Sequence, residues 1–169
     1  DGSYAAHEDV AVFEREMINP DEPVKDLEII EQPAWVKTMD DNVKHYGKPK
    51  AHYLKNVVYK NITTGEIVIG TVRGDLDVNK AKLEHAIDAV GQLEDASVED
   101  LHALGTKPGY VHSWGHEARY VGDYSLQTVR NFIGGQKEET TDSINVNYGR
   151  DFECDMLADI AMGQPGHQT

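Results

Sequence analysis

The most regular hydrophobic pattern of the chain lies between residues 54 and 90. Residues 54–60 and 66–73 have the apolar composition of two strands, and residues 61–65 have that of a hairpin turn. A helix pattern then begins near Asn79, whose side chain suits an N-cap. Four apolar residues at helical spacing predict one buried helix face: Leu83, Ala86, Ile87 and Val90.

The remaining patterns are short and irregularly ordered. Helices are predicted over residues 4–18, 38–46, 97–104 and 125–132, and strands over residues 27–30, 119–124 and 144–148. A glycine-rich loop is expected over residues 105–115. Because short strands and helices interleave without a regular βαβ order, the sequence predicts an α+β fold, in one domain spanning residues 1–169.

The composition is that of an acidic globular chain of 169 residues, of which 39% are hydrophobic. The net charge of −14 argues against nonspecific binding of nucleic acid, which would need a local basic patch or a neighbouring domain. No apolar run is long enough to span a bilayer, so no membrane partner is expected. The single cysteine, Cys154, excludes an internal disulfide and fits the reducing cytoplasm. Because the chain begins at Asp1, we expect it to be processed or excised from a larger protein.

An unusual cation lies at the front of the helix that begins near Asn79. Lys80 and Lys82 fall in its first turn, where the macrodipole favours carboxylates. Lys80 has Glu84 four residues on as a partner, whereas Lys82 has no acidic residue three or four positions ahead. A locally unpaired lysine beside a strand-end turn suits an anionic or ester ligand. The alternative is a solvated lysine at a helix edge, which is the commoner situation.

Basic and aromatic residues are mixed between residues 44 and 60. The lysines are Lys44, Lys48, Lys50, Lys55 and Lys60, and among them lie His45, Tyr46, His52 and Tyr53. Such a mixture can hold a nucleic-acid backbone and stack on bases. The alternative is a solvated helix end and strand edge, in keeping with the acidic total.

Metal and nucleophile chemistry have weak support in the sequence. His112 and His116 have the spacing of two zinc ligands, but the stretch is glycine-rich and no third ligand is indicated, so no metal site is predicted. A small metal-dependent hydrolase built on this pair is an alternative function. Ser113 beside His112 gives weak support for a catalytic triad. Acidic neighbours indicate that Cys154 is a packed thiol.

A motif around the helix at Asn79 resembles a known family. Val72-Arg73-Gly74-Asp75, then Asn79 and Lys82-Leu83, is similar to the editing (insertion) domain of bacterial-type prolyl-tRNA synthetases. Five further segments fall in the family's order: residues 36–38, 56–60, 131–135, 147–151 and 158–160. The resemblance covers roughly residues 4–165 and extends to the free-standing YbaK-like and prolyl-tRNA deacylases. It implies a mixed β-sheet or barrel-like core with surrounding short helices.

The resemblance implies hydrolysis of the ester of a mischarged tRNA(Pro), most often alanyl-tRNA(Pro), by a domain of prolyl-tRNA synthetase. The partners would be the 3′ end of tRNA(Pro) and the remainder of the synthetase, in the cytoplasm. No cofactor is expected for editing, because ATP would belong to the synthetic domain. Lys82 occupies the family's signature lysine position and is expected to be catalytic, acting on the substrate carbonyl or the terminal nucleotide. The alternative is a catalytically silent insertion that supports the synthetase or holds the tRNA end.

Seven further residues are expected to bind substrate: Tyr53, Arg73, Asn79, Gly109, His112, Ser113 and Asp142. Three of them depart from the family's pattern. Tyr53 stands in place of a threonine, Ser113 in place of the proline of a Gly-x-x-x-Pro loop that starts at Gly109, and Asp142 in place of a pocket histidine. Asp142 is expected either to bind the α-ammonium of the substrate or to repel the tRNA end. Tyr53 is expected to narrow the pocket or to stack on the terminal adenine, and the preferred amino acid is left open.

Overall fold

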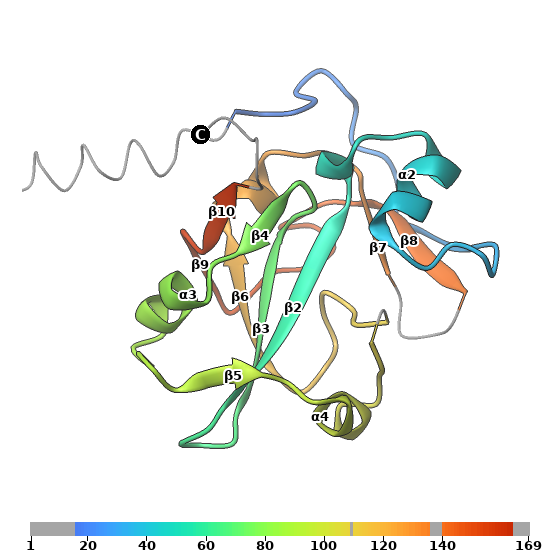
Figure 1. Cartoon of the computed structure of the whole chain (residues 1–169). Coiled ribbons are helices and arrows are strands. Elements are labelled where there is room, and N and C mark those ends of the chain that lie inside the picture. Colours follow the sequence, from blue (N-terminus) through green and yellow to red (C-terminus); the bar gives the residue numbers. More distant parts are fainter. Residues whose placement is uncertain (1–15, 109, 136–139, 164–169) are drawn as a thin grey trace, which may run out of the picture.

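The computed structural model describes residues 16–108, 110–135 and 140–163 of the chain. Figure 1 shows a strand-rich fold with short helices at its periphery. The helical elements are α2 (Met39–Tyr46), α3 (Lys80–Ala86), α4 (Val98–Ala103) and the 3-10 turns η1 (Lys50–His52) and η2 (Tyr124–Gln127). The strands are β1 (Glu28–Glu31), β2 (Leu54–Asn61), β3 (Ile67–Arg73), β4 (Leu76–Val78), β5 (Leu93–Asp95), β6 (Arg119–Asp123), β7 (Phe132–Gly135), β8 (Thr141–Val146), β9 (Met156–Ala158) and β10 (Ala161–Gly163).

A mixed five-stranded sheet forms the centre, with the strand order β5-β2-β3-β6-β9. β2 and β3 form the predicted antiparallel hairpin, in which Leu54 lies opposite Arg73. The side-chain oxygen of Asn61 accepts hydrogen bonds from two amides of the hairpin turn, and this stabilises the turn. β6 pairs parallel with β3, and β9 pairs parallel with β6. The predicted α+β fold with a mixed sheet is therefore confirmed.

The two faces of this sheet point to different parts of the molecule. Lys55 Nζ donates to the Leu76 carbonyl of β4 at 3.2 Å, whereas Asn56 Nδ2 donates to the Val111 carbonyl at 3.3 Å. Successive side chains of a strand point to opposite faces, so β4 and α3 cover one face, and the loop around Val111 lies over the other. In Figure 1, α3 lies to the left of the sheet, and α2, β7 and β8 lie to the right.

A hydrophobic cluster lies on each side of the central sheet. The first joins β3 and β6 to α3, β4 and the β9–β10 segment, and its fully buried members are Val68, Val72, Leu83, Val121 and Ile160. The second joins β2 to the three-stranded sheet β1-β8-β7, and it contains Leu54, Leu126, Val129, Phe132, Val146 and Phe152. These clusters hold the smaller sheet and the surrounding loops against the central sheet, because burial of apolar surface is the main stabilising term.

The sequence motif around Asn79 folds as predicted at its start but is shorter than predicted. The Asn79 side-chain oxygen accepts a hydrogen bond from the Lys82 amide at 3.1 Å, which confirms the N-cap. Leu83 is fully buried, as expected. α3 ends at Ala86, so the expectation of burial for Val90 is wrong: 68% of its surface is exposed.

The two other α-helices begin where their capping residues predict. Thr38 and Asp41 form a capping box at the start of α2, and Ser97 and Asp100 form one at the start of α4. Gly47 ends α2 with a φ of 69°, a left-handed conformation that glycine adopts without strain. Local sequence signals were sufficient at these positions.

The helix predicted over residues 125–132 is wrong. Only the turn η2 forms there, and Asn131 has a φ of 64°, which interrupts any helix before Phe132. Phe132 is fully buried and begins β7, which pairs with β8. Burial and strand pairing therefore outweigh the local helix pattern. The strand predicted over residues 144–148 is present, but it begins and ends earlier, at Thr141 and Val146.

Besides β7, four short strands have no counterpart among the predicted elements: β4, β5, β9 and β10. Each has three residues, and β4 pairs with β10 through contacts such as that of Val78 with Ala161. The expected barrel-like closure does not form among the described residues, where three open sheets are present. Most of the helix predicted over residues 4–18 lies outside the described residues, and residues 16–18 are not helical. No described helix is long and apolar enough to cross a membrane.

Candidate functional site

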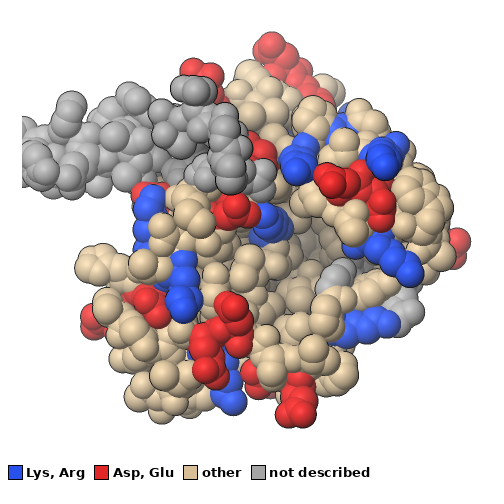
Figure 2. Space-filling model, in the orientation of Figure 1, with Lys and Arg blue, Asp and Glu red and all other residues tan. Residues whose placement is uncertain are grey.

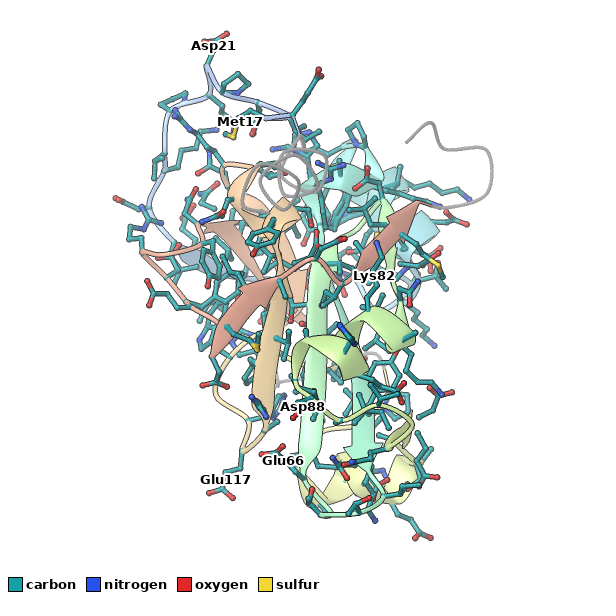
Figure 3. All side chains as sticks on the ribbon, turned by 90° about the vertical axis from the view of Figure 1, so that its left-hand side faces the viewer. Met17, Asp21, Glu66, Lys82, Asp88 and Glu117 are labelled. Carbon is teal, nitrogen blue, oxygen red and sulfur yellow. The ribbon has the colours of Figure 1, made fainter. Side chains whose placement is uncertain are left out.

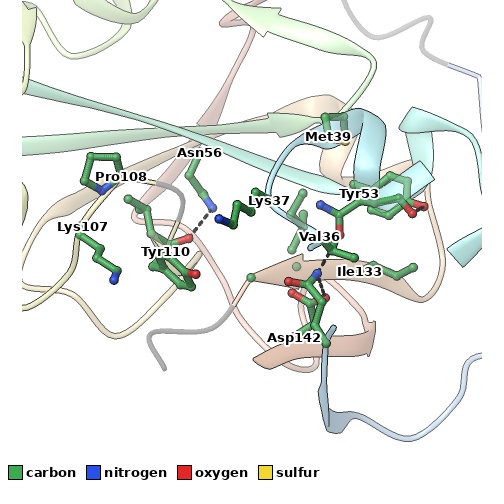
Figure 4. A pocket seen from close by; sticks show the side chains of 16 residues that line it. Val36, Lys37, Met39, Tyr53, Asn56, Lys107, Pro108, Tyr110, Ile133 and Asp142 are labelled. Atoms are coloured by element: carbon green, nitrogen blue, oxygen red, sulfur yellow. Dashed lines mark hydrogen bonds between the residues drawn. The ribbon is translucent and has the colours of Figure 1, made fainter. Parts of the chain in front are cut away.

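A cavity of about 530 Å³ opens on the sheet face that lies opposite α3. Small-molecule sites have volumes of roughly 300–1,000 Å³, so the cavity is large enough for one nucleotide with an attached amino acid. Figure 4 shows the side chains around it. The described residues that line it are Gln32, Val36, Lys37, Met39, Asn42, Tyr53, Leu54, Asn56, Lys107, Pro108, Tyr110, Val111, Ile133, Gly134, Gly135 and Asp142.

Asp142 provides the acidic group in this cavity lining. β8 pairs with β1 and β7, and these pairings place Asp142 opposite Ile30 and Gly135. Its Oδ2 atom accepts hydrogen bonds at 2.5 Å from Gln32 Nε2 and from the Tyr46 hydroxyl. The residue is only 5% exposed. Burial raises the pKa of the Asp142 carboxyl above its ordinary value, although the bonds from Tyr46 and Gln32 act in the opposite direction.

Tyr53 forms a wall of the same cavity. The residue is 3% exposed, and its hydroxyl lies 3.1 Å from the carbonyl oxygens of Asn42 and Lys48. Burial raises the pKa of Tyr53, so the phenol is neutral at physiological pH. Because the hydroxyl is engaged with backbone carbonyls, the ring contributes shape and apolar surface to the cavity.

Asn56 connects the central sheet to the loop that closes the cavity. Its Oδ1 accepts from Thr71 Oγ1 at 2.8 Å, and its Nδ2 donates to the Val111 carbonyl and to Ser113 Oγ. Ser113 therefore lies behind the cavity wall and is held by Asn56. A hydroxyl that is held in this way positions the loop, and it is not oriented by a histidine as the nucleophile of a catalytic triad is.

His112 is buried beside this loop and contacts the end of β7. Its Nδ1 lies 2.8 Å from the Gly135 carbonyl, and its ring centroid lies 3.8 Å from that of Trp114. The backbone amide of His112 donates to His116 Nε2 at 3.0 Å. The described residues contain no group of three or more His, Cys, Asp or Glu side chains that could hold a metal ion.

Two lysines are among the described residues that line the cavity, although the chain carries a net charge of −14. Lys37 precedes α2, and Lys107 lies on the loop, with its Nζ 4.9 Å from the centroid of the Tyr110 ring. Figure 2 shows a hollow near the middle of the molecule in this view, with both basic and acidic side chains around it. The local surplus of positive charge can attract an anionic group such as a phosphate.

Three of the predicted site residues do not line the cavity: Lys82, Asn79 and Arg73. Lys82 Nζ lies 3.1 Å from Asp159 Oδ2 and 3.0 Å from the Ala161 carbonyl, on the face of the sheet that α3 covers. Figure 3, which shows the left-hand side of Figure 1, has Lys82 facing the viewer. Asn79 caps α3 and does not line the cavity. The structure therefore does not bring Lys82 and Asn79 together with Tyr53 and Asp142.

Arg73 is buried in a structural ion pair. Its guanidinium binds both carboxylate oxygens of Asp75, at 2.5 and 2.9 Å, and it also donates to Thr128 Oγ1 at 3.0 Å. These contacts hold the turn after β3 against the segment that follows β6. Gly109 lies outside the described residues, between Pro108 and Tyr110, which line the cavity.

The basic and aromatic segment over residues 44–60 was expected either to bind nucleic acid or to be a solvated surface, and its residues divide between these two roles. Tyr53 lines the cavity and Tyr46 binds Asp142, in agreement with a site. Lys55 pairs with Asp77, and Lys60 pairs with Asp100, in agreement with a surface. Lysines of β2 are therefore structural, and the cationic groups of the cavity come from other segments.

The sequence reasoning missed several residues that build the site. Gln32 and Lys107 lie in no family segment, and Lys37 lies in the segment 36–38 without any sign that it lines a cavity. The contact of Gln32 with Asp142 spans 110 residues. Asn56 did carry a signal, because it begins the family segment over residues 56–60. Tyr46 was noted only as part of the basic and aromatic segment, and its contact with Asp142 spans 96 residues.

Comparison with protein families gives a match over most of this structure. Residues 33–152 match the family model described as an aminoacyl-tRNA editing domain. The proline–tRNA ligase of Fusobacterium nucleatum subsp. nucleatum is 35% identical in an alignment that covers 95% of this chain. That of Dehalococcoides mccartyi is 33% identical in an alignment that covers 97% of this chain. The chain spans 28% of the length of each of these relatives.

Solved structures share the fold at low sequence identity. A putative trans-editing enzyme for prolyl tRNA synthetase has a TM-score of 0.65 and 18% identity, over 81% of this chain and 87% of that chain. A hypothetical protein has a TM-score of 0.68 and 12% identity, over 93% of this chain and 99% of that chain. At these identities the likeness concerns the fold alone.

Proposed function

The chain belongs to the aminoacyl-tRNA editing domain family, and we propose on that premise that it hydrolyses the ester of mischarged tRNA(Pro), with alanyl-tRNA(Pro) as the substrate. The observation that carries the proposal is the cavity beside Asp142, which lies within the matched residues 33–152. It combines a buried carboxylate, two lysines and apolar walls in a volume suited to an aminoacylated nucleotide.

We further propose the setting in which this reaction occurs. The similarity to proline–tRNA ligases supports a role as the editing part of a prolyl-tRNA synthetase in the cytoplasm, with the 3′ end of tRNA(Pro) as its ligand. Editing itself would need no cofactor, and ATP would be used by the synthetic part of such an enzyme.

The chemistry of the proposed reaction makes modest demands on the protein. Proline and alanine differ by little apolar volume, so a synthetic pocket built for proline cannot fully exclude alanine, and a second site is needed. An aminoacyl ester is already activated, and a positioned water with some stabilisation of the developing oxyanion suffices to hydrolyse it. The rigid network of Asp142, Gln32 and Tyr46 supports this proposal because it can fix the position of the bound ester.

The catalytic role predicted for Lys82 stays a proposal. Its side chain is 42% exposed and pairs with Asp159. On the face of the sheet that α3 covers, the amine could act on an ester only if the tRNA end reached α3. The binding roles predicted for Arg73 and Asn79 also stay proposals. In the structure Arg73 binds Asp75, and Asn79 caps α3.

Time courses of ester hydrolysis test the proposed function. Alanyl-, cysteinyl-, seryl- and prolyl-tRNA(Pro) would each be incubated with the chain, and the remaining ester would be measured. We expect loss of a small aminoacyl group, alanyl first, and retention of prolyl. If no ester is lost faster than in buffer, the silent insertion domain becomes the better description.

A further inference from the structure

Asp142 forms no hydrogen bond or ion pair with a cationic group among the described residues, although His45 stabilises its charged form electrostatically. The two hydrogen bonds that it accepts come from uncharged groups, the amide of Gln32 and the hydroxyl of Tyr46, and both reach Oδ2. Oδ1 accepts none in the part of the chain that the structure describes, and no lysine or arginine there forms an ion pair with this carboxylate. A buried carboxylate without a directly bonded cation is costly, and such groups normally pair with a cation or bind one.

The carboxylate is directed into the cavity rather than into the protein core. Asp142 is 95% shielded from solvent and still lines the cavity, and Figure 4 shows its side chain there beside Ile133 and Val36. Gln32 Nε2 also lies 3.0 Å from Asn42 Oδ1, so the carboxylate is fixed by groups that are themselves held. A fixed acceptor of this kind suits a compact cation with several N–H donors, such as an ammonium group.

Groups of the opposite charge line the same cavity. In Figure 4, Lys107 lies at the left of the view, well apart from Asp142, and Lys37 lies near the middle. An aminoacylated 3′ nucleotide has a matching polarity, because its α-amino group is cationic and its phosphate is anionic. The cavity therefore distinguishes the two ends of such a ligand.

We propose that the Asp142 carboxylate binds the α-ammonium group of the aminoacyl ester, with the phosphate directed toward Lys37 and Lys107. This inference rests on the proposed function and adds to it a requirement for a free α-ammonium group on the substrate. Of the two roles that the sequence left open for Asp142, the geometry supports binding of the ammonium group rather than repulsion of the tRNA end. An ester whose amino group is acylated would lose this contact, so the site would act on aminoacyl-tRNA and spare peptidyl-tRNA.

Binding of two amide analogues tests the inference without any need for hydrolysis. The probes are 3′-alanylamino-3′-deoxyadenosine 5′-monophosphate and the matching propionylamino compound, which lacks only the amino group. Their dissociation constants for the whole chain would be measured by calorimetry. We expect the alanylamino compound to bind at least about tenfold more tightly, the effect of one charge-assisted hydrogen bond.

The Asp142→Asn variant assigns the preference to the carboxylate. We expect the ratio of the two dissociation constants to fall to within about twofold, while the affinity for the propionylamino compound stays nearly unchanged. Asp40→Asn is the matched control, because it removes the same charge from a side chain that is 80% exposed and does not line the cavity. It should keep the wild-type ratio. Unfolding curves of both variants would establish that they are folded.

Three outcomes would overturn the inference: equal binding of the two compounds by the wild-type chain, no binding of either, or a preference that survives in Asp142→Asn. Equal binding of the two compounds by the wild-type chain overturns the inference even where the variant does not fold. Failure of the proposed function alone would give a different result. The esters of tRNA(Pro) would then stay intact in the hydrolysis time courses, while the binding preference would still be present.

Discussion

At the scale of single residues, the site is defined by a carboxylate that the fold buries at a cost. Asp142 is held by Gln32 and Tyr46, which lie 110 and 96 residues away in the chain. Sequence patterns identified Asp142 and Tyr53 through their places in family motifs. They did not identify Gln32, because nothing near it in the sequence encodes a contact over such a separation.

The raised pKa of Asp142 predicts a pH dependence of stability. The folded state binds the Asp142 proton more tightly than the unfolded state, whose carboxyl has a pKa of about 3.9. The contribution of Asp142 to the free energy of unfolding therefore falls as the pH rises from that value through the higher pKa of the folded state. Asp142→Asn removes this loss, and the variant should gain stability relative to wild type between pH 4 and pH 7.

Urea unfolding of both proteins across that pH range would measure the effect. The gain should increase with pH and then level off. A difference that stays constant with pH, or that decreases as the pH rises, would show that the Asp142 proton is bound no more tightly in the folded state. Stability that improves when a polar residue is neutralised is typical of functional sites.

At the scale of elements, locally encoded features were predictable and long-range ones were not. α2 and α4 begin at capping boxes that the sequence displays. β4 and β10 have three residues each and exist only because they pair with each other, so no local pattern could reveal them. The same limit applies to the site, because the sequence placed Lys82 on a helix but could not indicate which face of the sheet that helix covers.

Leu83→Ala tests how α3 is held against the sheet. Leu83 is fully buried in the first hydrophobic cluster, so its truncation should lower the free energy of unfolding by about 2–5 kcal/mol. Val90→Ala, at a site that is 68% exposed, is the control and should change it by no more than about 0.5 kcal/mol. Chemical denaturation would measure both, and similar values for the two variants would refute this packing.

Lys82→Ala tests the role predicted for the first turn of α3. Loss of a charge-assisted contact in the transition state should slow deacylation of alanyl-tRNA(Pro) at least about tenfold. Lys80→Ala is the control, because Lys80 is an exposed lysine in the same turn. An unchanged rate for Lys82→Ala would remove Lys82 from the mechanism and leave the chemistry to the cavity around Asp142.

At the scale of the whole molecule, the charge limits how the chain meets RNA. The net charge of −14 repels a phosphate backbone, and the described residues of the cavity supply only Lys37 and Lys107 against it. The family and the mixed sheet could be predicted from the order of motifs along the chain. The openness of the sheets could not, since it depends on how short strands pair across the fold.

The overall charge predicts weak and salt-sensitive binding of tRNA by this chain alone. An electrophoretic shift assay with tRNA(Pro) at increasing salt should show binding only at low ionic strength, because each phosphate contact releases counterions. Tight and sequence-specific binding at physiological salt would contradict this. Such binding would require a basic patch on the surface that attracts tRNA in spite of the negative net charge.

Hydrolysis of alanyl-tRNA(Pro), compared with prolyl-tRNA(Pro) under the same conditions, is the most direct measurement of the central claim. We expect the chain to release alanine faster than the spontaneous reaction in buffer and to leave the prolyl ester at its spontaneous rate. Asp142→Asn should retain less of this activity than the exposed control Asp40→Asn. Loss of neither ester above the spontaneous rate would contradict an editing function for this cavity.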